Sequence, residues 1–449
     1  MELKDKRVLV VGLGKSGVAS ALFLKAHGAR VSVSDTKSGD ELRNEIPVLL
    51  DHGITVETGG HGERTFRGQD LIVVSPGVPV DAPPLVQARS AGETVIGEIE
   101  LAAQFLPGPI VAITGSNGKT TTTTLTGEIL TAGGIETLVG GNIGTPAITL
   151  AERARPETAI VLEVSSFQLE TIQTFRPKVA VVLNVTPDHL DRHHTLEAYV
   201  NAKARIFENQ QPSDFAVLNA DDPTCVAMAA RTKAQVFWFS RHKEVERGAS
   251  VRDGAILFRD TRGQQEVLQV SDIPLKGAHN LENVLAAVCA GALMGCAPDK
   301  IRQTVQNFKA VEHRLEFVAT INGVDYYNDS KATNVDATIK ALESFPANIH
   351  LILGGKDKGS DYTVLNDLLR QRVKRVYTIG AAAAKIESQL KNVEVVHAET
   401  LENAIRKAHA VAQPGDVVLL APACASFDQF KSYEHRGKVF KEIVKGLAG

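Results

Sequence analysis

The sequence predicts an α/β protein made of three domains, each built on a largely parallel sheet. Short β-branched runs alternate with helical stretches along the chain, which is typical of parallel strands joined by crossover helices. The chain has 449 residues, too many for one core, and about 150 residues per domain predicts roughly three domains. Two glycine-rich loops each follow an apolar run, where such folds bind nucleotides.

Each predicted domain has its own set of apolar runs. The first domain, residues 1–96, has strands at 6–12, 30–35 and 70–77 and a helix at 18–27. The second, residues 97–309, has strands at 110–115, 159–165, 179–185 and 215–219 and ends in a packed helix at 280–294. The third, residues 310–449, contains the runs VDYYNDS, IHLILGG, RVYTIG, VEVVHA and DVVLLAP.

The composition excludes several classes of protein. The 49 Lys plus Arg are balanced by 52 Asp plus Glu, without the basic stripe that duplex nucleic acid requires, so we expect no nucleic-acid partner. The apolar runs are strand-sized and far short of the roughly 20 residues that cross a bilayer, so we expect no membrane insertion. The start of the chain lacks a signal-peptide pattern, and the four cysteines show no disulfide or zinc spacing. We therefore expect a reduced, cytoplasmic protein.

The first glycine-rich loop, Gly12-Leu13-Gly14-Lys15-Ser16-Gly17, matches the GxGxxG fingerprint of dinucleotide-binding folds. It follows a strand and opens a helix, and Asp35 closes the next strand. Bare glycines let a pyrophosphate approach the helix N-terminus, and the acid accepts from a ribose hydroxyl. These residues alone leave three interpretations open: an NAD-dependent dehydrogenase, a site for another nucleotide diphosphate, or simple strand–helix packing.

The second loop, residues 114–121 (TGSNGKTT), also follows an apolar strand. Its backbone N–H groups and a helix N-terminus can wrap a triphosphate, while Lys119 neutralises the outer phosphates and Thr120 ligates Mg²⁺. Ile113 stands where the strict phosphate-loop pattern has its first glycine, so this loop is a shorter variant. ATP is the better-supported ligand of the two loops.

Polar residues at strand ends extend this site. Glu163 ends an apolar strand, and a carboxylate beside a phosphate loop is placed to hold Mg²⁺. His189 is a candidate ligand of a second divalent ion, while His193 and His194 are expected to face solvent. The spacing of these histidines matches no zinc site. By spacing alone, Lys203 is predicted to be a surface lysine.

The third domain offers three polar segments after apolar runs: residues 328–334, 354–359 and 421–428. Together they supply cations, hydroxyls and turns, which favours a pocket for a carboxylate substrate. Cys424 has no His partner nearby in the sequence and is predicted to be a buried structural thiol.

The motifs taken together resemble the Mur ligase family across the whole chain. TGSNGKTTT, EVSSFQLE, NVTPDHLDRH, AHNLENVLAA, HRLE, DSKATN and APACASFDQFKSYEHRG occur in the family's order. DSKATN and ACASFDQF favour the branch that adds D-glutamate over branches that add other amino acids and over folylpolyglutamate synthases. The resemblance implies an ATP-dependent ligase that joins D-glutamate to UDP-N-acetylmuramoyl-L-alanine through an acyl phosphate, in peptidoglycan precursor synthesis.

The resemblance also implies a role for each domain and for individual residues, and we expect the protein to be a monomer. The UDP-sugar would contact Gly14, Lys15, Ser16, Asp35, Thr36, Lys37 and Asn142. ATP would contact Gly115, Ser116, Asn117, Gly118, Lys119, Thr120, Thr121, Asn280, Asn283, Arg314 and Asp329. D-Glutamate would contact Lys331, Thr333, Lys358, Ser426 and Tyr433. Two Mg²⁺ ions would be held by Thr120, Glu163, His189 and a carbamylated Lys203.

Within that set, the catalytic residues implied are Lys119, His189 and Lys203. Two residues differ from the pattern of some relatives: Tyr433 replaces a Phe, and Lys37 replaces an Arg. Three alternatives remain at this stage. A dehydrogenase would leave the second loop unexplained, an ATP-dependent switch would need no amino-acid pocket, and a sister ligase with a different amino acid is the nearest competitor.

Overall fold

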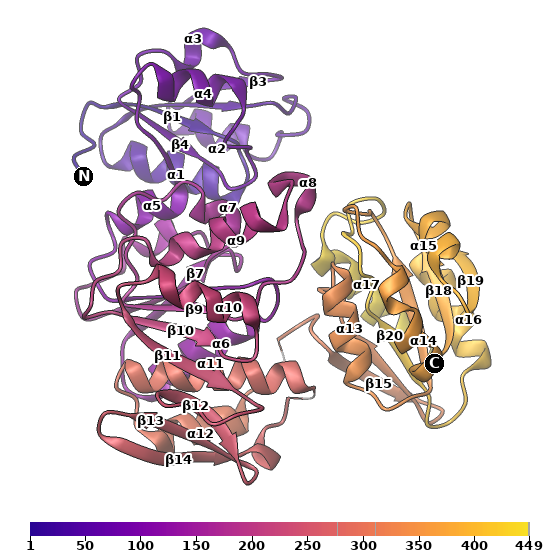
Figure 1. Cartoon of the computed structure of the whole chain (residues 1–449). Coiled ribbons are helices and arrows are strands. Elements are labelled where there is room, and N and C mark those ends of the chain that lie inside the picture. The colour runs from indigo at the N-terminus through magenta and orange to yellow at the C-terminus, as the bar shows by residue number, and fades with distance from the viewer. Residues whose placement is uncertain (276, 310, 448–449) are drawn as a thin grey trace. The chain divides into compact units, whose positions relative to one another are not determined.

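The computed structural model describes residues 1–275, 277–309 and 311–447, which form three sheets in two compact units (Figure 1). The first unit consists of Met1–Val185, Glu197–Val270 and Asn283–Val305 and carries two sheets. The second consists of Thr186–Leu196, Ser271–Glu282 and Gln306–Gly449 and carries the third sheet. None of the described helices has the length and apolar character needed to cross a bilayer. The α/β class predicted from the sequence is confirmed.

The first sheet has five parallel strands in the order β3-β2-β1-β4-β5. The strands are β1 (Arg7–Val11), β2 (Arg30–Asp35), β3 (Thr55–Thr58), β4 (Leu71–Val74) and β5 (Val95–Gly97). The helices are α1 (Lys15–Ala26), α2 (Ile46–Asp51), α3 (Glu63–Phe66), α4 (Pro83–Ser90) and α5 (Glu98–Ala103). From β1, the sheet grows first to one side through β2 and β3 and then to the other side through β4 and β5. Such a switch point leaves a crevice beyond the carboxyl ends of the strands, and the first glycine-rich loop follows β1 at this place.

The second sheet has nine strands in the order β14-β13-β12-β11-β10-β9-β6-β8-β7. They are β6 (Ile110–Thr114), β7 (Thr137–Gly141), β8 (Ala159–Glu163), β9 (Val179–Val182), β10 (Phe215–Asn219), β11 (Gln235–Ser240), β12 (Gly248–Arg252), β13 (Ala255–Asp260) and β14 (Gly263–Gln269). Its helices, some of them short 3₁₀ turns, are α6 (Lys119–Ala132), η1 (Ala147–Leu150), α7 (Ser166–Leu169), α9 (Leu196–Ala204), η2 (Arg205–Phe207), α10 (Pro223–Met228), η3 (Ala229–Arg231), η4 (Val270–Asp272), α11 (Ala278–Leu293) and α12 (Pro298–Asn307). Because β6 lies between β8 and β9, the residues that follow these three parallel strands meet at one edge.

The third sheet has six strands in the order β15-β16-β20-β17-β18-β19, with β15 antiparallel to the others. The strands are β15 (Glu316–Ile321), β16 (Val324–Asn328), β17 (Ile349–Gly354), β18 (Val373–Ile379), β19 (Glu394–Glu399) and β20 (Val417–Leu420). The helices are α13 (Val335–Glu343), η5 (Thr363–Leu365), α14 (Asn366–Arg372), α15 (Ala383–Gln389), α16 (Leu401–Val411) and α17 (Tyr433–Gly446), and the second unit also contains α8 (Leu190–His193).

The hydrophobic cores follow from these sheets. One cluster of buried side chains runs through both sheets of the first unit and includes Val10, Ile110 and Ile160. In the second unit, separate clusters around Leu351 and Ile352, which alternate along β17, cover the two faces of the third sheet.

Several strands were not expected from the sequence, chiefly β3, β7 and the hairpins of β12–β14. The residues of β14 are largely exposed, with the burial concentrated in Val267 and Leu268. An edge strand with few buried positions lacks the apolar run that marks a central parallel strand.

Candidate active site

The first glycine-rich loop is shaped by backbone crowding. Gly12 has a φ of 89°, and a Cβ on Gly17 would lie 1.8 Å from the Gly12 carbonyl oxygen, so both positions require glycine. The Ser75 hydroxyl, just after β4, donates to the same carbonyl at 2.7 Å. A Cβ on Gly14 would meet nothing within 4 Å. Gly14 therefore presents open backbone at the N-terminus of α1, where an anion is favoured.

Asp35 connects this loop to the one that follows β2. Its carboxylate accepts from the backbone N–H of Leu13 at 2.6 Å and from that of Lys37 at 2.8 Å. A carboxylate has about four acceptor positions, so the two bonds leave capacity for a ligand hydroxyl. The other predicted UDP contacts in this domain lie on the same two loops and are exposed or half-buried: Lys15, Ser16, Thr36 and Lys37.

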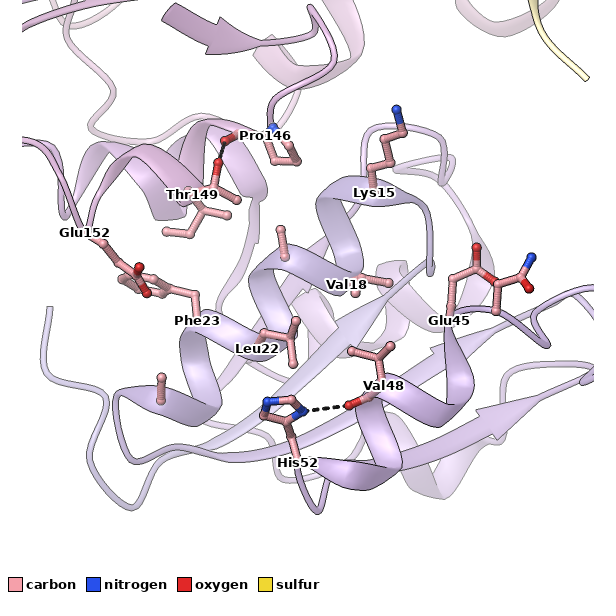
Figure 2. A pocket seen from close by; sticks show the side chains of 14 residues that line it. Lys15, Val18, Leu22, Phe23, Glu45, Val48, His52, Pro146, Thr149 and Glu152 are labelled. Carbon is pink, nitrogen blue, oxygen red and sulfur yellow. Dashed lines mark hydrogen bonds between the residues drawn. The ribbon is translucent and has the colours of Figure 1, made fainter. Parts of the chain in front are cut away.

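A cavity of about 670 Å³ lies along α1, between α1, α2 and η1 (Figure 2). Its walls are mainly apolar, with Leu22 and Val48 facing it from two helices and Ile148 from η1. Figure 2 shows the Lys15 side chain extending away from these walls. The apolar lining does not match a diphosphate, so we do not assign this cavity to the sugar nucleotide.

The second glycine-rich loop forms a compact cradle between β6 and α6. Gly115 and Gly118 have φ values of 150° and 87°, and Gly118 is the N-cap residue of α6. The Lys119 ammonium donates to the carbonyls of Gly115 and Ser116 at 2.8 and 2.9 Å. The lysine is therefore folded over its own loop, where it can reach a bound phosphate.

Asn184, just after β9, holds this loop in place and was not among the predicted site residues. Its carbonyl oxygen accepts from the backbone of Ser116 at 3.0 Å, and its side-chain oxygen accepts from the backbone of Asn117 at 2.9 Å. Its side-chain amide donates to the Asn117 carbonyl at 3.1 Å. The sequence signal for this role was a polar residue just after β9, the strand that pairs with β6 before the loop.

Glu163 lies at the predicted magnesium position, at the end of β8. Its carboxylate accepts from the Thr120 hydroxyl at 2.7 Å and from the Asn142 side-chain amide at 2.8 Å. Hard oxygen donors of this kind, next to Lys119, suit Mg²⁺. Asn142, predicted to contact the UDP-sugar, thus bonds to the carboxylate that was predicted to hold Mg²⁺.

Lys203 is buried, which contradicts the surface position that its spacing suggested. It is 1% exposed, its ammonium donates to the Gly115 carbonyl at 2.9 Å, and it lies 4.5 Å from the centre of the Tyr199 ring. The Tyr199 hydroxyl lies 3.1 Å from Ser116 Oγ. Because α9 packs this face against the glycine loop, a polar side chain is placed inside the protein. Helical spacing alone cannot show which face is buried.

Asn283 of α11 also contacts the cradle, because a Cβ on Gly118 would lie 2.1 Å from its side-chain oxygen. Asn283 is 4% exposed. The predicted ATP contact Asn280 lies one turn earlier on the same helix, in the part assigned to the second unit. The first unit therefore brings together most of the predicted triphosphate site.

In the second unit, Asp329 follows β16 and is fully enclosed. Burial raises its pKa to about 6, partly offset by the positive charge of Arg314. One of its carboxylate oxygens has no hydrogen-bond partner among the described residues. Burial lowers the pKa of His279 to about 3, and the positive charge of Arg314 contributes to the same shift. A buried, unsatisfied carboxylate next to an arginine is typical of a ligand site.

Arg436 organises the predicted amino-acid pocket and was missed from the sequence. It is 0% exposed and donates to the Ser330 carbonyl at 2.8 Å and the Cys424 carbonyl at 3.1 Å. Its Nε also donates to the Ser330 hydroxyl at 3.0 Å. Burial lowers its pKa to about 10. The guanidinium thereby joins the loop before Lys331 to the loop before Ser426.

Of the predicted D-glutamate residues, Lys331, Thr333 and Ser426 lie on these loops, and Tyr433 begins α17. The Lys331 ammonium lies 3.4 Å from the Tyr433 hydroxyl and 5.2 Å from the centre of its ring. Ser426 is buried and Thr333 is half-buried. Cys424 is buried, as predicted, and lies 3.0 Å from the Tyr362 hydroxyl. Burial raises the pKa of its thiol to about 11, which suits a structural role.

Asp188 gathers several predicted residues within the second unit. Its carboxylate accepts from Asn334 at 2.9 Å and pairs with Lys358 at 3.4 Å and with His189 at 3.6 Å. A cavity of about 470 Å³ lies beside this group. His193, expected to face solvent, is 6% exposed because the short helix α8 turns it inward. His194 is exposed, as expected.

Elsewhere in the described residues, Glu312, His313 and Glu316 place three possible metal ligands close together. Lys441 donates to Glu312 at 2.5 Å and to Glu316 at 2.9 Å. The ammonium therefore already neutralises these carboxylates, and we assign no metal there.

Comparisons with known proteins match this arrangement. Three family models follow one another: the Mur ligase MurD-like N-terminal domain over residues 6–97, the Mur ligase middle domain over 113–291, and the Mur ligase glutamate ligase domain over 313–424. Their order is that of the three sheets.

The most similar relatives compared span the full chain. A protein of Koribacter versatilis named UDP-N-acetylmuramoylalanine–D-glutamate ligase is 69% identical over 448 residues, covering 100% of this chain and 99% of its own length. A protein of the same name from Acidobacterium capsulatum is 59% identical, covering 100% and 98%. A solved pseudomurein peptide ligase type C of Methanothermus fervidus shares the fold with a TM-score of 0.62 at 21% identity, covering 99% of this chain and 100% of that one. With three family models in order and relatives this similar from end to end, the chain belongs to the Mur ligase family.

Proposed function

We propose that this protein is the ATP-dependent ligase that joins D-glutamate to UDP-N-acetylmuramoyl-L-alanine. The observation that carries the proposal is the 69% identity, over the full chain, to a relative named for that reaction. Residues 1–96 would bind the UDP-sugar, residues 97–309 ATP and residues 310–449 D-glutamate. The glycine cradle around Lys119 and the ammonium of Lys331 beside Tyr433 support the proposal.

The chemistry explains why ATP is required. A carboxylate acylates amines poorly because an oxide would have to leave, so one carboxylate oxygen must first become a phosphate ester. We propose that the L-alanyl carboxylate attacks the γ-phosphorus of ATP to give an acyl phosphate and ADP. The amine of D-glutamate then attacks the acyl carbon, and a tetrahedral intermediate expels phosphate. Lys119, which lies over the loop, would offset the repulsion between the two anions in the first step.

We propose that Thr120 and Glu163 hold Mg²⁺ beside the triphosphate, with His189 as a ligand of a second ion. The oxygen donors of Thr120 and Glu163, beside the cradle, fit the first of these ions. Mg²⁺ would supply Lewis-acid stabilisation of charge on the transferring phosphoryl group.

We also propose that Lys203 is carbamylated. Its buried amine lies against the carbonyl of Gly115, in the loop whose following helix carries Thr120. Reaction of the neutral amine with CO₂ forms an N–C bond and releases one proton, converting a cation into a carboxylate-like metal ligand.

The test is an amino-acid panel with purified full-length protein, UDP-N-acetylmuramoyl-L-alanine, ATP and Mg²⁺. We expect phosphate release only with D-glutamate, and the amide product by mass spectrometry. L-Glutamate and D-alanine are matched controls for configuration and for the side-chain carboxylate. Release with another amino acid and not with D-glutamate would identify a sister ligase and refute the proposal. Consumption of ATP with no amino acid present would instead favour a nucleotide-driven switch.

A further inference from the structure

A hydrogen-bonded network holds the loop after β3 against the residues proposed to bind uridine diphosphate. In the parallel register, Ser34 of β2 lies opposite Glu57 of β3. Ser34 is 0% exposed, donates to Glu57 Oε2 at 3.0 Å and lies 2.8 Å from His61 Nδ1. The other Glu57 oxygen accepts from the backbone N–H of Gly62 at 3.2 Å. Side chains from β2, β3 and the loop therefore meet one residue before Asp35.

The direction of each hydrogen bond follows from proton counting. The Ser34 hydroxyl has one proton, and two of its partners, Glu57 Oε2 at 3.0 Å and the Gly60 carbonyl at 3.4 Å, accept it. The hydrogen between His61 and Ser34 must then belong to His61 Nδ1, which assigns the histidine tautomer from its partners. The imidazole also meets the Phe66 ring edge to face, with centroids 5.5 Å apart. These contacts define the orientation of the His61 ring.

The same loop is bonded directly to the nucleotide-site backbone. Gly59 donates its backbone N–H to the Lys37 carbonyl at 2.7 Å, and Gly60 donates to the Asp35 carbonyl at 3.4 Å. Asp35 in turn accepts from Leu13 of the first glycine-rich loop. The chain of contacts thus runs from His61 through β2 to both loops that would hold the diphosphate and ribose.

We infer that His61 is a positioning residue for the uridine diphosphate site. By donating to Ser34, it keeps residues 59–62 against Asp35 and Lys37, and so fixes the loop that receives the sugar nucleotide. This inference rests on the proposed function, because that function puts a uridine diphosphate at these residues. The reacting carboxylate, ATP and D-glutamate belong to other residues, so the effect of His61 is confined to nucleotide binding.

The test measures UDP binding by calorimetry and steady-state kinetics on the full chain. In His61→Ala we expect the Kd for UDP and the KM for the UDP-sugar to rise about five- to tenfold, the effect of one lost hydrogen bond and a loosened loop. The kcat and the KM for ATP should stay within about twofold, as one surface loop is affected. Ser34→Ala, which also removes the bonds to Glu57 and to the Gly60 carbonyl, should raise the Kd for UDP and the KM for the UDP-sugar at least as much.

Two substitutions separate the hydrogen bond from simple packing. The side-chain amide of His61→Asn places an N–H at the position of Nδ1, whereas that of His61→Gln reaches the position of Nε2. We expect Asn to restore UDP binding to within about twofold of wild type and Gln not to do so. His52→Ala is the matched control: this exposed histidine of the same domain bonds only the Val48 carbonyl in the described contacts (Figure 2), and its loss should leave the Kd unchanged.

Several results would overturn the inference. Tight UDP binding by His61→Ala would do so, as would equal losses in the Ala and Asn variants, because the Nδ1 donor would then be irrelevant. A fall in kcat with a lower thermal midpoint would indicate general destabilisation instead of positioning. Failure of the proposed function is distinguishable: a sister ligase would still bind UDP as wild type but would not respond to D-glutamate, and a protein of another class would bind no UDP even as wild type.

Discussion

Replacing Asp329 by Asn should stabilise the second unit at neutral pH, in the absence of ligands. The Asp329 pKa is raised from 3.8 to about 6 by burial, so its ionised form is held at a cost. Above pH 6 both folded and unfolded chains carry the charge, and the folded state is destabilised by about 3 kcal/mol. Below pH 3.8 both are protonated and the cost disappears. Stability therefore falls as pH rises through this window, and the neutral amide removes that dependence.

Hydrogen exchange followed by mass spectrometry is the suitable assay, because it reports on individual strands of the second unit. Tryptophan fluorescence would not do so, since the single Trp of the sequence, Trp238, lies in the first unit. Amides of β16 and β20 should be protected up to about 100-fold more in Asp329→Asn than in wild type at pH 8, corresponding to about 3 kcal/mol. At pH 5 the gain should be about half as large in free energy. Asp325→Asn, in the preceding strand β16 and half-exposed, is the control.

An Asp329→Asn variant with no added protection at pH 8, or with the same gain at pH 5, would show that burial does not raise the pKa of this carboxylate. The same variant should lose ligase activity, since we place Asp329 in the nucleotide site. A protein that is more stable and less active would mark the carboxylate as a group kept for function at the expense of stability.

Three further predictions concern the phosphate cradle. Gly118→Ala should abolish ATP binding in calorimetry, because the added Cβ would lie 2.1 Å from the Asn283 side chain at a residue whose φ is 87°. Gly134→Ala is the control, since Gly134 has a similar φ of 81° but no atom within 4 Å of the added Cβ. This control has the backbone strain without the clash and should bind ATP normally. The Lys119→Ala variant should bind UDP as wild type does but form ADP at least about 100-fold more slowly, because the substitution removes a positive charge that acts during phosphoryl transfer. Normal ADP formation by this variant would contradict the proposed role of Lys119. Lys203→Ala should lose activity and regain part of it with added formate or acetate; no recovery with either anion would speak against the carbamate.

Much of the fold and of the triphosphate site could be predicted from the sequence, because those features are local. The strand before Gly115 and the helix from Lys119 are encoded by one continuous segment, and a glycine loop between them creates an anion site by itself. The same holds for the strand, loop and helix around Gly14. The resemblance to the Mur ligase family, based on ordered motifs, is also confirmed.

What depended on tertiary structure was the environment of residues whose neighbours are distant in the sequence. Lys203 lies inside the protein only because α9 packs against a loop 88 residues earlier in the chain. Arg436 is buried with no carboxylate partner at hydrogen-bonding distance among the described residues, because the backbone carbonyls of Ser330 and Cys424 accept from it instead. Local patterns determine which elements form, since propensity and periodicity act over a few residues; burial and pairing of charges are decided only when the sheets bring distant segments together.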